Sequence, residues 1–472
     1  MRFPTLRPGA LAAAVLLAGT TAGAQTIAVT GGTVIDATGR PPMPDAVVLI
    51  KDGRIVAVGN AAAVTIPASA NRIDARGKYV IPGLMDANLH LFLNIPLDDL
   101  IRLEDRYDEV VIEGAQIALK NGMTTVFDTW GPTAALIKAR DRINAGQAVG
   151  SRFYLAGNII GFSGPLGPDF LGAAAAHVPM AFTKKINDTW EQGTGRELLW
   201  MPPDTLRAAI RKYLGLSVDF LKFGGSGHVD MNLLTFSPRA ERVIVEEGHR
   251  AGRTVQAHVS SPESIDMAVD AGVDILTHGD ISGPAYPIPA ETIKKIVDRG
   301  VSVSALAVTK RHLDAMTKLA QPGLAPYHKI ALENIRNMVK AGVKLMVSTD
   351  AGVEDPIRLA ESPNLAADTS DSRVKLGEGH FNAMMAFEEA GMTPMEILKS
   401  ATSNVARAYK LEQEIGTLEP GRRGDLVILD ANPLESARNY RRIRSVIKDG
   451  RVIDLAALPT APVISSRKVP KP

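Results

Sequence analysis

The sequence contains no cysteine among its 472 residues. This absence excludes disulfides, thiolate metal sites and a cysteine nucleophile, so any metal must be held by histidine, by carboxylate or by a rarer donor. Aromatic residues make up only 5% of the chain, and 53 Lys and Arg balance 51 Asp and Glu. With few rings for stacking and no excess of one charge, the composition does not favour nucleic-acid binding. We expect a small-molecule substrate as the partner.

Long hydrophobic runs are also absent, apart from a short one near the start of the chain. Arg2 and Arg7 precede an apolar stretch over residues 9–19, and the small residues 22–24 follow it. This order is typical of a secretory signal peptide, so we expect residues 1–24 to be removed during export to the periplasm or the medium. The run is shorter than the ~20 apolar residues of a membrane-spanning helix, and no stable membrane insertion is expected.

The two ends of the remaining chain have β-type sequences. Residues 25–81 and 412–459 contain runs such as AVVLIKDGRIVAVG and SVIKDGRVIDL, with Asp-Gly turn signals between β-branched stretches. We predict that these two segments pair into one small β domain. Residues 460–472 are rich in proline and basic side chains, which is typical of a loose tail.

Residues 82–411 follow a different rhythm, in which a helical stretch, a glycine and a short apolar strand recur, as in VDAGVDILTH. The glycine stands where a helix ends in the left-handed conformation. Eight candidate strands alternate with helices, which predicts an α/β fold of the (β/α)₈ TIM-barrel type, with a doubly wound sheet as the alternative. An insertion over residues 158–204, rich in Gly, Pro, Phe and Trp, is expected to form a lid or pocket wall.

Polar residues end several of these strands. His258, His278 and Asp350 each follow a buried run at the carboxyl end of a candidate strand. In a barrel, active sites are built at that end. Imidazole and carboxylate groups there suit Zn²⁺, Mn²⁺ or Co²⁺, with a coordination position left open for water.

The first and fourth strands carry further candidates. Asp86, Asn88 and His90 alternate along the first strand, so they are predicted to share one face. Lys222 lies within an otherwise apolar fourth strand, VDFLKFGGSG. It could extend to solvent, or burial could lower its pKa and leave a neutral amine that reacts with carbon dioxide to form a carbamate ligand.

This combination resembles the amidohydrolase superfamily, in particular its imidazolonepropionase-like and exported dipeptidase-like members. That family has a flanking β-sandwich, the motif PGxxDxHxH on strand one, a lysine on strand four, histidines on strands five and six and an aspartate on strand eight. The matching positions here are PGLMDANLH at 82–90, Lys222, His258, His278 and Asp350. Asn88 departs from the pattern, because it replaces the first histidine, and in this respect the chain is similar to the phenylurea and molinate hydrolases.

The resemblance implies a metal-dependent hydrolase of a carbon–nitrogen bond in an amide, N-acyl amino acid or dipeptide, carbamate or urea. It implies one or two divalent ions, with Zn²⁺ expected first, and a carbon-dioxide-derived carbamate on Lys222. The implied metal ligands are His90, carbamylated Lys222, His258, His278 and Asp350, with Asn88 as a weak ligand or an outer partner. Asp350 would also be the catalytic base that takes a proton from metal-activated water and passes it to the leaving nitrogen.

Two alternatives stay open. A cyclic-amidine deaminase would fit the family, although such members generally lack the strand-four lysine. A metal-poor binding protein on the same scaffold is kept open by Asn88. His228, Tyr154 and His380 are weaker candidates for substrate binding, and a homo-oligomer is compatible with the sequence.

Overall fold

The structure of the protein is a computed structural model that describes residues 26–92, 96–283, 286–318, 325–361 and 374–469. The expected signal peptide, residues 1–24, lies outside this part of the chain. Among the described helices, none combines the length and the apolar character needed to cross a bilayer.

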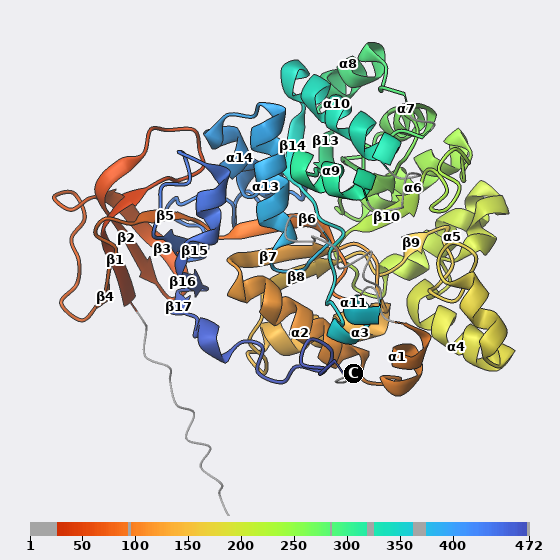
Figure 1. Cartoon of the computed structure of the whole chain (residues 1–472), viewed down its shortest axis with the longest axis horizontal. Coiled ribbons are helices and arrows are strands. Elements are labelled where there is room, and N and C mark those ends of the chain that lie inside the picture. The colour runs from red at the N-terminus through yellow and green to blue at the C-terminus, as the bar shows by residue number, and fades with distance from the viewer. Residues whose placement is uncertain (1–25, 93–95, 284–285, 319–324, 362–373, 470–472) are drawn as a thin grey trace, which may run out of the picture.

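The small domain at one end of the molecule is built from both ends of the chain (Figure 1). Strand β5 pairs antiparallel with β15, with Val80 opposite Ile428, and this pairing joins the two segments as predicted. The side chains of Ile27, Val48 and Ile447 are fully buried in the core that this sheet encloses. The strands are β1 (Thr26–Val34), β2 (Met43–Lys51), β3 (Arg54–Asn60), β4 (Asn71–Asp74), β5 (Tyr79–Pro82), β15 (Leu426–Leu429), β16 (Ile443–Lys448) and β17 (Arg451–Val452).

The large domain contains parallel strands in chain order, which confirms the predicted barrel and excludes the doubly wound sheet. Strands β8 and β9 are consecutive pieces of the third barrel strand. The eighth barrel strand, β14, is joined to the first, β6, by backbone hydrogen bonds at or just beyond their ends, from Asp350 N to Asn88 O (3.0 Å) and from His90 N to Ala351 O (2.9 Å). The strands are β6 (Leu84–Leu89), β7 (Met123–Asp128), β8 (Arg152–Leu155), β9 (Ile159–Ile160), β10 (Leu221–Gly224), β11 (Val255–His258), β12 (Ile275–Thr277), β13 (Ser302–Ala305) and β14 (Lys344–Val347).

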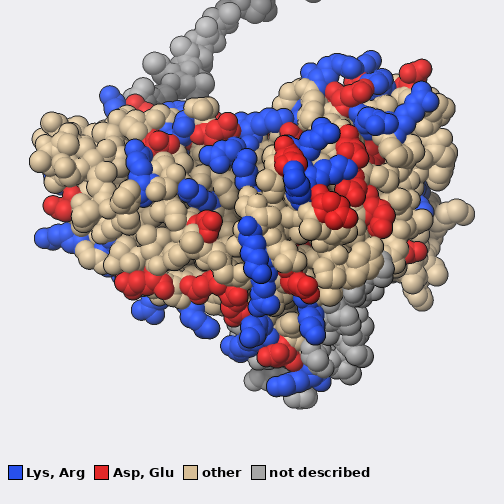
Figure 2. Space-filling model, turned by 90° about the horizontal axis from the view of Figure 1, so that it is seen from above, with Lys and Arg blue, Asp and Glu red and all other residues tan. Residues whose placement is uncertain are grey.

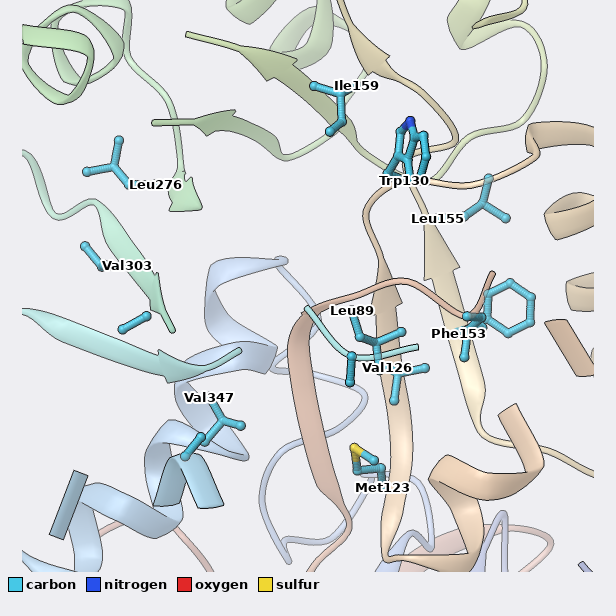
Figure 3. Packing of buried hydrophobic residues seen from close by; sticks show 14 of the residues in the cluster. Leu89, Met123, Val126, Trp130, Phe153, Leu155, Ile159, Leu276, Val303 and Val347 are labelled. Atoms are coloured by element: carbon cyan, nitrogen blue, oxygen red, sulfur yellow. The ribbon is translucent and has the colours of Figure 1, made fainter. Parts of the chain in front are cut away.

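Helices surround these strands (Figure 1). They are α1 (Leu97–Arg102), α2 (Tyr107–Lys120), α3 (Thr133–Asn144), α5 (Pro203–Leu214), α6 (Pro238–Arg250), α7 (Pro262–Ala271), α8 (Ala290–Arg299), α9 (Lys310–Lys318), α10 (Ala325–Ala341), α11 (Pro356–Glu361), α13 (Gly379–Ala390), α14 (Pro394–Ser400) and α15 (Ser403–Ala408). As the sequence predicted, α7 ends at a left-handed glycine, Gly272, with φ +91°. Buried strand residues such as Val126, Leu276 and Val347 pack with helix residues into one hydrophobic core (Figure 3).

A separate apolar cluster fills the barrel interior and its amino-terminal end. The ring of Tyr409, which follows α15, stacks on Phe127 with 3.6 Å between ring centroids, and its hydroxyl donates to Ala87 O at 2.7 Å. Because packed side chains fill this end, the carboxyl ends of the strands are the place where an open polar site can form.

The insertion over residues 158–204 has elements of its own. It contains β9, two short 3₁₀ segments, η1 (Gly172–His177) and η2 (Arg196–Trp200), and helix α4 (Met180–Glu191). Trp190 is buried, whereas Trp200 is 72% exposed. On the face of the molecule seen in Figure 2, basic and acidic side chains are intermixed.

The carboxyl-terminal segment differs from the predicted loose tail. Residues 460–469 lie against α1 and α2, and the backbone amides of Val463 and Ile464 donate to the buried Glu113 carboxylate at 2.8 and 2.9 Å. Composition alone predicted mobility, but a buried carboxylate requires donors, and this segment supplies them.

Candidate active site

The carboxyl ends of the barrel strands bring the predicted polar residues together. His258 is the last residue of β11, Lys222 lies within β10, and Asn88 lies within β6. All three are buried, as are His90 and His278. The strand register that sequence spacing predicted therefore places these side chains at one end of the barrel.

Asp350 is at the centre of this cluster. Its Oδ1 lies 3.1 Å from His278 Nε2 and 3.5 Å from His90 Nε2. Burial acts to raise the pKa of Asp350, but the neighbouring imidazoles of His278 and His90 outweigh burial and hold that pKa well below its ordinary value. The carboxylate is therefore ionised and able to accept a proton.

Burial affects the pKa values of two of the histidines, His258 and His90. Burial, assisted by the neighbouring His278, lowers the pKa of His258 well below its ordinary value. Burial also lowers the pKa of His90, although Asp350 opposes this effect. Neutral imidazole is the form that binds metals.

Two of the cluster residues have left-handed backbone conformations. His278 has φ +61° and Asp350 has φ +55°. This conformation costs a residue with a Cβ atom about 1–2 kcal/mol relative to right-handed geometry. Backbone strain of this kind tends to occur where a side chain must be directed into a site.

The amide of Asn88 is fixed from both sides. Its Nδ2 donates to Asp350 Oδ1 at 2.5 Å and to Ser348 Oγ at 3.1 Å. Its Oδ1 accepts from Lys222 Nζ at 3.2 Å and from Thr129 Oγ1. Because the amide oxygen already has two donors, the geometry favours the outer-partner role over the weak-ligand role.

Lys222 does not extend to solvent, since its side chain is only 1% exposed. Its amine donates to Asn88 Oδ1 and, at 3.0 Å, to Thr129 Oγ1, and both acceptors are neutral. Burial lowers the pKa of Lys222 to about 8, although the charges of Asp350 and Asp128 oppose the shift. An amine in this environment loses its proton far more easily than an exposed lysine does.

Asp86 is buried beside the cluster. Its Oδ2 accepts from Thr349 Oγ1 at 2.6 Å, and its Oδ1 accepts from Asn88 N at 3.1 Å. The carboxyl group thus links the first strand to the eighth.

The donor types in the cluster suit a divalent cation. The Nδ1 atoms of His258 and His90 are buried and have no hydrogen-bond partner, which is costly unless another group occupies that side. Among the residues that the structure describes, no three His, Asp or Glu side chains are grouped to hold an ion in their present positions. The donor atoms are therefore of the type that binds a divalent metal, and these side chains would have to move closer together to coordinate one.

Aromatic side chains form a wall beside the cluster. Phe162 lies 5.4 Å from His258 between ring centroids, and Phe170 stacks on Trp130 at 4.1 Å. The exposed His228 ring lies 4.8 Å from Phe170, so this weaker candidate does reach the site.

Trp130 and Thr129 were not predicted as site residues. Trp130 lies 6.1 Å from His90 between ring centroids, and Thr129 bonds both Asn88 and Lys222. Both residues directly follow the strand TTVFD, and this position after a strand end is the sequence feature that could have identified them as site residues.

Two predicted substrate-binding residues lie elsewhere. Tyr154 stacks on Phe127 and lines a cavity with Arg152 and Arg423 near the small domain. His380 Nε2 donates to Asn121 O at 3.0 Å, where α2 ends beside the start of β7. The contacts of the described residues do not join either side chain to the histidine cluster, and a role of either one in substrate binding stays a prediction.

Comparison with known proteins agrees with this geometry. The Amidohydrolase family profile matches residues 79–453. The solved structure of molinate hydrolase is 36% identical, with a TM-score of 0.89 over 94% of this chain and 98% of that one. Phenylurea hydrolase B is 35% identical, with a TM-score of 0.88 over 94% and 100%. Ochratoxinase of Aspergillus niger is 26% identical over 421 residues, which is 86% of this chain and 81% of that protein.

Proposed function

The chain belongs to the amidohydrolase family, and from this premise we propose that it hydrolyses a carbon–nitrogen bond of a small molecule by means of a metal-activated water. The observation that carries the proposal is the Asp350 carboxylate, which lies within 3.5 Å of both His90 Nε2 and His278 Nε2 beside a buried lysine. This arrangement provides metal-binding nitrogens and a proton acceptor in one place.

The metal would be held by His90, His258, His278 and Lys222 as its carbamate, with Zn²⁺ as the first candidate. When bound, such an ion makes water a stronger acid and polarises a carbonyl group. Asp350 takes the proton of the attacking water and delivers it to the leaving nitrogen. Asn88 orients Asp350 through the amide nitrogen, and its oxygen positions the Lys222 side chain.

The substrate class follows from the aromatic wall and from the similar proteins. Phe162, Phe170 and Trp130 offer ring surfaces beside the histidines. Molinate hydrolase and phenylurea hydrolase B are both above 30% identical over nearly the whole chain. We therefore favour a small amide, carbamate or urea with an apolar or aromatic group as the substrate.

Lys222 favours the hydrolase hypothesis over the deaminase and the binding-protein hypotheses. The buried amine has only neutral hydrogen-bond partners, which suits carbamate formation and would be an expensive feature without that use. The apolar leader at residues 1–24 supports the proposal that the enzyme acts outside the cytoplasm.

The test compares metal content, hydrolysis of phenylurea and carbamate substrates, and carbon-13 NMR with labelled bicarbonate. We expect about one or two metal ions per chain and a carbamate signal in the parent protein, with both lost in Lys222→Ala. Lys212→Ala, on the exposed face of α5, is the matched control and should behave like the parent. A parent protein with no metal and no carbamate signal would overturn the proposal.

A further inference from the structure

The carboxyl-terminal segment is attached along one face of α2. The carboxylate of Glu113, 1% exposed, accepts the backbone amides of Val463, Ile464 and Ser465 at 2.8, 2.9 and 2.8 Å, and also the Ser465 hydroxyl. Burying a carboxylate costs free energy unless hydrogen-bond donors surround it, and this segment provides those donors. The segment is therefore held at a specific binding site on α2.

The same face of α2 provides two more attachments. Gln116 Oε1 accepts Thr460 N at 2.8 Å, and Gln116 Nε2 donates to Thr460 Oγ1 at 3.0 Å. One turn further, Lys120 Nζ donates to Leu458 O at 2.9 Å. Because residues 113, 116 and 120 are three and four positions apart, they form one stripe on the helix.

Beyond this stripe, Arg467 joins two loops at the rim of the barrel. Its Nη1 lies 2.5 Å from Asp355 Oδ2 and 2.9 Å from Asp99 Oδ2. The two carboxylate side chains are only 3% and 1% exposed. Asp99 also pairs with a second cation, Arg102, and Asp355 pairs with Arg467.

These two loops carry the site. Asp99 lies in α1, which follows the strand of Asn88 and His90, and Asp355 lies five residues after Asp350. Asp355 Oδ1 also accepts Ile357 N at 3.0 Å and so fixes the start of α11. One guanidinium thus spans the loops after the first and the eighth strands.

We propose that residues 458–467 form a strap that holds these two loops in register, and that Arg467 is a positioning residue for Asp350 and His90. Without its cation, the buried Asp355 carboxylate would have to move towards water and would draw the loop of Asp350 with it. The strap itself rests only on these contacts, whereas its effect on turnover rests on the proposed function.

The experiment uses the full chain with Arg467→Gln, Arg467→Lys and the double variant Arg467→Gln with Asp355→Asn. Lys468→Gln, an exposed neighbouring cation, is the matched control. The readouts are kcat and KM for a substrate that the parent hydrolyses, the midpoint of thermal unfolding, and hydrogen exchange of residues 96–103 and 351–357.

In Arg467→Gln we expect faster exchange in both loops and a kcat reduced roughly tenfold or more, with KM changed less, because small displacements of reacting groups are costly. Arg467→Lys should recover part of the kcat. The double variant should recover the unfolding midpoint, since no buried charge is left unpaired, but not the kcat.

A double variant that recovers both the midpoint and the kcat would overturn the positioning role, because charge balance alone would then explain the effect. Unchanged exchange in both loops of Arg467→Gln would overturn the strap. The exchange measurement needs no substrate, so failure of the strap and failure of the proposed function give different results.

Discussion

The amide nitrogen of Asn88 donates to Oδ1 of Asp350 across the join between the first and eighth barrel strands, with 2.5 Å between the two atoms. Backbone hydrogen bonds from Asp350 N and Thr349 N to Asn88 O, at 3.0 and 3.2 Å, hold the two residues in this position. The position that departs from the family motif therefore fixes the Asp350 carboxylate beside the histidines, because the Asn88 amide nitrogen donates to it.

Replacing Asn88 with alanine tests this role. Asp350 would lose a donor, and Lys222 and Thr129 would lose a shared acceptor. We expect kcat to fall at least roughly tenfold through misplacement of the base. Ser348→Ala, which removes only one partner of the same amide, is the control and should cost much less. Equal kcat values in Asn88→Ala and the parent would contradict the role.

If Phe162, Phe170 and Trp130 form the aromatic wall of the substrate site, their loss should change KM more than kcat. In Phe170→Ala, loss of the ring that stacks on Trp130 should raise KM for an aromatic substrate about three- to tenfold, with kcat changed little. Phe182→Ala removes a half-buried ring from the same insertion and is the matched control. A loss confined to kcat, or the same change in both variants, would show that Phe170 does not contact the substrate.

Acid stability should depend on Glu247 in α6. Hydrogen bonds from Arg211, then from Arg207 and Arg250, outweigh burial and lower the pKa of Glu247 to about 2. Since the ordinary value of 4.5 applies to the unfolded chain, the stabilisation is complete above about pH 5 and is lost as the pH falls towards 2.

The measurement is urea unfolding from pH 3 to pH 7 for the parent protein and Glu247→Gln. The variant should lose roughly 1–3 kcal/mol of unfolding free energy near pH 7, and the two proteins should converge as the pH falls. Glu246→Gln, which removes a largely exposed partner of Arg207, should differ little from the parent across this range. A difference that is constant from pH 3 to pH 7 would exclude the ion pairs as its cause.

Much of the fold was readable from local sequence features. A glycine such as Gly272, followed by a short apolar run, marks a helix end and a buried strand, because both depend on backbone conformation and on burial within a few residues. The same local order placed His258, Lys222 and Asp350 near the carboxyl ends of strands, where the barrel brings them together.

Other outcomes depended on partners that are distant in the chain. Tyr154 and His380 were assigned from their nearness to strands, but packing against Phe127 and the backbone of Asn121 places them away from the histidines. The composition of residues 460–469 predicted a loose tail, although the buried carboxylate of Glu113, some 350 positions earlier, holds the segment in place.

The sequence by itself therefore determined the barrel, the pairing of the two ends of the chain in the small domain, and the set of polar residues at the strand ends, because periodicity and turn signals are local. Only the tertiary structure decided that Asn88 faces Asp350, that Thr129 and Trp130 belong to the site, and that Arg467 reaches the rim. Those outcomes depend on where distant side chains meet and on which buried polar groups remain to be satisfied, and no single stretch of sequence contains that information.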